Sequence, residues 1–88
     1  MSLTLESAYE LDPQVSLRPE PFGALAYHYG TRRLVFLRSP DIVRVVESLD
    51  QQDSLAAALD AAEIEHRRWP AFVSALTDLA ASEVIRAR

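Results

Sequence analysis

The sequence predicts an α+β domain in which a three-stranded antiparallel sheet is followed by three helices. Three observations predict this order. Residues 15–18 alternate between apolar and polar with the two-residue period of a half-buried strand, and two further strand-like segments, residues 24–29 and 33–37, meet at a glycine turn. From residue 40 onward, apolar residues recur every three or four positions, which is typical of amphipathic helices. The only two glycines, Gly23 and Gly30, lie in the first half, where a chain that reverses direction benefits from a backbone that can adopt positive φ.

Three short strands are expected before residue 38. The first covers residues 15–18, which alternate between flanking prolines. The second, residues 24–29, has Leu25, Tyr27 and Tyr29 on one face and Ala24, Ala26 and His28 on the other. A hairpin turn over Tyr29–Arg32 leads to the third strand, Arg33–Leu37, which is apolar on both faces apart from Arg33. Its second apolar face is therefore expected either to lie against another layer or to be a surface for a partner.

Three helices are expected after residue 38. The first begins at Ser39-Pro40, since serine can cap a helix and proline is tolerated in the first turn. The second follows Asp53-Ser54, and the third runs from Trp69-Pro70 to about Ser82. Their predicted core stripes are Ile42, Val45, Val46 and Leu49; then Leu55, Ala58, Leu59 and Ala62; then Trp69, Phe72, Val73, Leu76, Leu79 and Ala80. Val84-Ile85 is expected either to form a brief strand or to extend the last helix.

Length and composition indicate one globular domain over residues 1–88. About half of the residues are hydrophobic and a quarter are charged, as in average globular proteins. Cysteine is absent, and no apolar stretch approaches the ~20 residues that span a bilayer. We therefore expect a cytoplasmic protein without a membrane partner. Residues 1–12 show no sustained period and are expected to be an extended lead-in; whether it is mobile or ordered is left open by the sequence.

No group of residues in the sequence predicts catalysis. His28 and His66 lie on different elements without metal-ligand spacing, and each is expected to be structural. Ser39 and Ser54 are explained as helix caps, and the chain has no glycine-rich loop that could hold a phosphate. We expect no catalytic residue, no metal site and no cofactor, and hence a protein that is not an enzyme. A small enzyme that uses His28 or His66 is the least supported alternative.

The third strand and the third helix could instead form a groove. An extended peptide can add to the edge of a sheet through main-chain hydrogen bonds and insert alternate side chains between the strand and a helix. Arg32 and Arg33, at the start of this strand, would either keep the edge soluble or attract an acidic peptide.

The sequence resembles a known family at Leu17-Arg18-Pro19-Glu20-Pro21-Phe22-Gly23, at Tyr27-His28-Tyr29-Gly30-Thr31-Arg32-Arg33-Leu34 and at Ser39-Pro40. From about Val15 to Ile85 it is similar to the precursor-peptide chaperones of the mycofactocin system, which belong with the pyrroloquinoline quinone-system chaperones and other RiPP recognition elements. The resemblance implies a winged-helix-like domain that binds the leader of a ribosomal precursor peptide and presents it to a radical S-adenosylmethionine maturase. It also implies that the leader adds beside the third strand and packs on the third helix, at Arg33, Leu34, Val35, Phe36, Leu37, Phe72, Val73, Leu76 and Leu79.

Two further possibilities concern partners. A winged-helix DNA-binding regulator has a similar order of elements, but the net charge of −4 and the lack of basic residues on the third helix argue against nucleic acid as a partner. A homodimer formed through an exposed edge strand is left open by the sequence.

Overall fold

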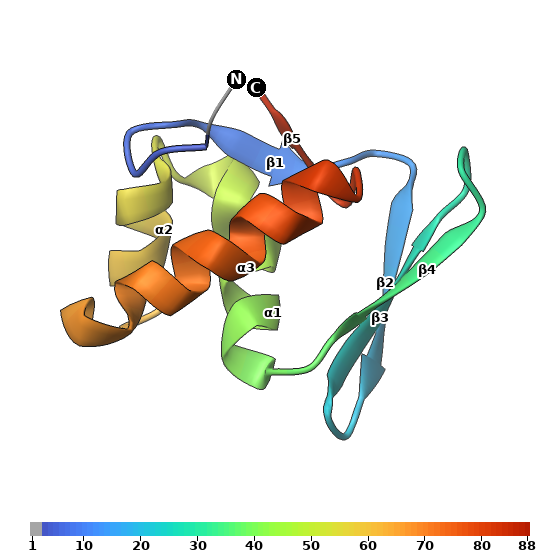
Figure 1. The fold of residues 1–88 in the computed structure, drawn as a ribbon, viewed down its shortest axis with the longest axis horizontal. Coiled ribbons are helices and arrows are strands. Elements are labelled where there is room, and N and C mark those ends of the chain that lie inside the picture. Colours follow the sequence, from blue (N-terminus) through green and yellow to red (C-terminus); the bar gives the residue numbers. More distant parts are fainter. Residues whose placement is uncertain (1–2) are drawn as a thin grey trace.

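A computed structural model describes residues 3–88, which form two sheets and a layer of helices (Figure 1). In chain order the elements are β1 (Tyr9–Leu11), β2 (Val15–Glu20), β3 (Gly23–His28), β4 (Arg33–Leu37), α1 (Pro40–Ser48), the 3-10 helix η1 (Leu49–Gln51), α2 (Leu55–Ala61), the 3-10 helix η2 (His66–Arg68), α3 (Trp69–Ala81) and β5 (Ile85–Ala87). The predicted α+β class, with three antiparallel strands followed by three α-helices, is confirmed.

The larger sheet has the strand order β2-β3-β4 and is antiparallel throughout. Its register pairs Ala24 with Leu37 and His28 with Arg33, so residues 29–32 form the predicted hairpin turn. The sheet face toward the helices carries the buried side chains of β3 and β4, which are Ala24, Ala26, His28 and Leu37. Small alanines on this face allow α1 to pack closely on β3.

The helices begin where the sequence predicts. The Ser39 hydroxyl oxygen accepts from the backbone N–H of Asp41 at 3.2 Å, and Ser54 caps α2 by accepting from Ala57 N–H at 3.1 Å. The core stripe of α1 is buried in full, together with Leu55, Ala58 and Leu59 of α2 and with Phe72, Leu76 and Leu79 of α3. Figure 1 shows α3 crossing in front of α1, with the larger sheet standing to one side of both helices.

The N-terminal segment, whose order the sequence left open, is held against the rest of the chain over the residues that the structure describes. Strand β1 pairs antiparallel with β5, and the carbonyls of Leu5 and Ser7 accept from the first backbone N–H groups of α2. The sequence left open whether Val84-Ile85 forms a brief strand or extends the last helix. The structure has the strand, β5 (Ile85–Ala87). The sequence pattern missed β1 because its partner lies at the other end of the chain. Residues 1–2 of the predicted lead-in lie outside the described residues.

The two glycines have different roles, and only one has positive φ. Gly23 has φ +148°, and a Cβ there would overlap the carbonyl oxygen of Leu37. In the β3–β4 turn the residue with positive φ is Arg32, at 61°, instead of Gly30. At Gly30 a Cβ would displace the end of the flexible Gln14 side chain and would lie 3.0 Å from Cε1 of His28.

Candidate functional site

Strand β4 has one unpaired edge. Within the described residues it pairs only with β3, so the backbone groups on its other side have no strand partner. Such an edge can accept a further strand through N–H···O=C hydrogen bonds. The opposite edge strand, β2, contains Pro19, which has no backbone N–H to donate. The free edge of β4 is therefore the more complete template for pairing.

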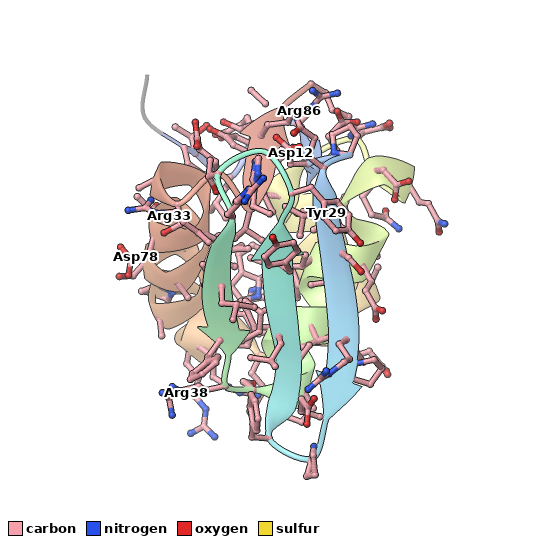
Figure 2. The ribbon with its side chains drawn as sticks, turned by 90° about the vertical axis from the view of Figure 1, so that its right-hand side faces the viewer. Asp12, Tyr29, Arg33, Arg38, Asp78 and Arg86 are labelled. Carbon is pink, nitrogen blue, oxygen red and sulfur yellow. The ribbon has the colours of Figure 1, made fainter. Side chains whose placement is uncertain are left out.

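A groove with a volume of about 350 Å³ lies between β4 and α3. Its walls come from the edge of β4 and the residues that follow it, from α1, and from the last turns of α3. The lining residues are Val35, Phe36, Leu37, Arg38, Ser39, Ile42, Ala75, Asp78, Leu79 and Ser82. Figure 2 shows α3, with Asp78, beside the free side of β4. The unpaired backbone of β4 thus faces a mostly apolar channel.

The groove continues toward the start of α3. A second hollow of about 140 Å³ shares Ser39, Ile42 and Ala75 with the first and adds Arg68, Ala71 and Phe72. From Ala71 to Ser82, α3 rises by ~16 Å, because a helix advances ~1.5 Å per residue. An extended chain covers that length with about five residues, which equals the length of β4. Strand β4 lines the groove with Val35, Phe36 and Leu37, and the groove then continues past the end of the strand along Ser39 and Ile42.

The structure brings five of the nine predicted site residues together in this groove. Val35, Phe36, Leu37, Phe72 and Leu79 line it. Arg33 is exposed at the start of β4, and Leu34, 62% exposed, lies on the opposite face of the sheet. Leu76 is fully buried in the core, and Val73 is half-buried on α3 without lining the groove. The predicted set thus divides between the groove, the far face of the sheet and the core.

Sequence reasoning missed the α3 side of the groove. Ala71, Ala75, Asp78 and Ser82 follow one another at spacings of four, three and four residues, which places them on one face of the helix. The prediction followed the apolar stripe at Phe72, Leu76 and Leu79 instead, because large apolar residues dominate the helical periodicity of hydrophobicity. A stripe of small residues beside a large apolar one was the available signal, since small side chains allow another chain to approach closely.

The face of the larger sheet that points away from the helices is also apolar. We call it the outer face; it carries Phe22, Leu25, Tyr27, Tyr29, Leu34 and Phe36, and along β2 the polar residues Ser16, Arg18 and Glu20. The four exposed large hydrophobic residues among residues 3–88, which are Phe22, Tyr29, Leu34 and Phe36, all belong to it. The sequence left open whether this face lies against another layer or is a surface for a partner. Within the described residues no other element covers it.

Charge is distributed unevenly between the sheet and the rest of the chain. Residues 13–39 contain four arginines and one glutamate, whereas the remainder contains five arginines and twelve acidic residues. Among the described residues, Arg32, Arg33 and Arg38 have no carboxylate within ion-pair distance, while Arg68 pairs with Asp41 at 3.0 Å. Figure 2 shows Arg33 and Arg38 at the two ends of β4. The sheet is thus the positive pole of an acidic protein.

The histidines have structural contacts. His28 is buried, and its Nδ1 accepts from the backbone N–H groups of Gly30 and Thr31, both at 3.1 Å, so it holds the β3–β4 turn. His66 is exposed, and its Nε2 lies 3.6 Å from Oδ1 of Asp60. Within residues 3–88, no three His, Asp or Glu side chains come together in a way that could hold a metal ion. The same residues include no helix long and apolar enough to cross a membrane.

An unpaired edge strand beside an apolar groove is the arrangement of domains that hold an extended polypeptide. Comparison with known proteins gives the family. The model of the peptide chaperone MftB family matches residues 8–86, and the chain belongs to that family. It is 40% identical over 80 residues to the peptide chaperone MftB of Mycobacterium ulcerans, covering 91% of this chain and 73% of the relative.

Two further relatives carry the same name. The peptide chaperone MftB of Mycobacterium tuberculosis is 39% identical over 80 residues, covering 91% of this chain and 73% of the relative. That of Mycolicibacterium smegmatis is 41% identical over 78 residues, covering 89% and 76%. No solved structure matches the chain significantly.

Proposed function

We propose that this protein is a non-enzymatic peptide chaperone that binds the leader of a ribosomal precursor peptide and presents it to a radical S-adenosylmethionine maturase in mycofactocin biosynthesis. The leader adds as a strand to the free edge of β4, and its side chains enter the groove against α3. The cytoplasm is the expected compartment. The maturase supplies the chemistry, and this chain supplies binding and delivery.

The observation that carries this proposal is that the unpaired edge of β4 lies beside a mostly apolar groove against α3. Main-chain hydrogen bonds to β4 would fix the register and direction of the peptide, each contributing ~0.5–1.5 kcal/mol net. Leu79 and Phe72 give the groove an apolar wall, and Ala71 and Ala75 leave room for inserted side chains. Membership in a family of peptide chaperones supports the same function.

A DNA-binding regulator is not supported by any feature of the helices. The only charged residue of α3 is Asp78, so this helix has no arginine to contact a phosphate. The groove face of α3 also lies beside β4, which would hinder its entry into a major groove.

Calorimetric titration of the chain with the synthetic precursor leader tests the proposal. A single-site association is expected. A matched peptide, N-methylated at alternate backbone nitrogens, should bind more weakly, because each methyl group removes one donor from the ladder and adds bulk at the strand edge. A leader that gives no heat and does not displace a fluorescent copy of itself would refute the proposal. Equal affinity for every N-methylated peptide would refute the strand addition.

A further inference from the structure

The outer face of the sheet exposes large apolar side chains to which another protein could bind. Its side chains stand opposite one another across the strands: Leu25 faces Phe36 across β3 and β4, and Tyr27 faces Leu34. The rings of Phe22 and Phe36 are 5.9 Å apart, and those of Tyr27 and Tyr29 are 5.1 Å apart. The result is an apolar area over β3 and β4, bordered by the polar residues Ser16, Arg18 and Glu20 of β2. Figure 2 looks onto this side of the sheet.

The outer face differs in shape from the groove. A hollow of about 260 Å³ on this face lies between the side chains of all three strands. A broad face of this kind suits the surface of a folded protein, whereas the narrow channel beside β4 suits an extended chain. Exposed apolar surfaces with polar rims are typical of protein contacts.

Charge decides between a second copy of this chain and another protein. Arg32 and Arg38, which have no ion-pair partner among the described residues, lie near this face, whereas Arg18 is paired with Glu20 at 2.8 Å. The sheet segment is positive while the rest of the chain is strongly acidic. Two copies that meet through their outer faces would bring two positive poles together. An antiparallel pairing of two β4 edges about Val35 would likewise set Arg32 of one copy opposite Arg38 of the other. Contact between this face and the acidic helical side of another copy would be head-to-tail and would not close into a dimer.

The outer face is continuous with the edge where the leader is proposed to add. Phe36 belongs to both surfaces: it is 51% exposed on the outer face and it also lines the groove. A strand added to β4 would extend the sheet, and every second side chain of that strand would point to the outer face. A protein docked on the outer face would therefore contact the added peptide directly.

We propose that the outer face, centred on Phe22, Tyr29, Leu34 and Phe36, is the docking surface for the maturase, which meets it with an apolar patch rimmed by acidic residues. This assignment rests on the proposed function, because it concerns the protein that receives the peptide. The positive rim would speed the encounter and make it sensitive to salt.

The test uses the full chain with Phe22→Asp and Tyr29→Asp together. Both residues lie in exposed turns and neither lines the groove. The matched control, Gln51→Asp with Ser74→Asp, adds the same charge on the helical half of the chain at exposed positions. Affinity for the purified maturase is measured by biolayer interferometry, and affinity for the leader by calorimetry.

We expect the outer-face variant to bind the maturase at least tenfold more weakly and the leader as the unsubstituted chain does, while the control keeps both affinities. Unchanged maturase affinity in the outer-face variant would overturn the assignment. So would a dimer of the unsubstituted chain in light scattering that the outer-face variant converts to a monomer, because a second copy would then occupy the face. Failure of the unsubstituted chain to bind the leader would instead refute the proposed function.

Discussion

Ala75→Glu is the substitution that tests the groove most sharply. Ala75 lies in both sections of the groove and is only half-buried in the free protein. In the unliganded variant the carboxylate can therefore reach water, and exchanging alanine for glutamate, another good helix former, costs less than about 0.5 kcal/mol in helix propensity. The fold should tolerate the change.

Binding of the leader would remove that carboxylate from water. A buried charge without a partner costs several kcal/mol, and Asp78, one turn further along α3, would add repulsion instead of compensation. A loss of ~3 kcal/mol corresponds to about a hundredfold weaker binding, because each 1.4 kcal/mol is a factor of ten. Calorimetry with the leader measures this loss.

Ser74→Glu is the matched control. It adds the same side chain one residue earlier on α3, at an exposed position that does not line the groove. The control should bind the leader as the unsubstituted chain does, with equal thermal melting of both variants. Binding of the leader by Ala75→Glu with unchanged affinity would show that the peptide does not use the groove.

Three further predictions concern the arginines of the sheet, the cap of α1 and the two glycines. Arg33→Glu with Arg38→Glu should slow association with the maturase about tenfold at low salt, and stopped-flow rates that do not change would mean that these arginines do not steer the encounter. Ser39→Ala removes the α1 cap and should lower the free energy of unfolding in urea by ~1 kcal/mol; no loss would argue against the cap. Gly23→Ala should cost more than ~2 kcal/mol, because its Cβ would overlap the Leu37 carbonyl at an unfavourable φ. Gly30→Ala should cost less, because its Cβ would overlap only the end of the flexible Gln14 side chain and would lie 3.0 Å from Cε1 of His28. Equal losses for the two glycines in urea would contradict this reading.

Local patterns in the sequence predicted most of the fold. The cap at Ser39, the alternation in β3 and the stripe of α1 are each formed by residues close together in the chain, so their physical cause can be read locally. Strand β1 could not be read in this way, because the pairing of Glu10 with Arg86 joins residues 76 positions apart. Its three residues also have no distinctive alternation.

The sequence named the two elements that line the groove, β4 and α3, but only some of the residues on them that do so. Periodicity identifies the buried face of α3 but does not show which side of that face meets β4, and so Leu76 was grouped with the groove although it is fully buried. The edge position of β4 depends on strand order, which no local pattern encodes. Ala75 and Asp78 were missed for the same reason, since their place in the groove depends on how α3 packs beside the sheet.

Amide hydrogen exchange of the chain with and without the precursor leader tests the central claim most directly. If the leader adds as a strand to β4, alternate amides of Arg33–Leu37, those that point away from β3, should gain protection, and those on the outer edge of β2 should not. Protection confined to β2 or to α2, with β4 unchanged at saturating leader, would contradict the account.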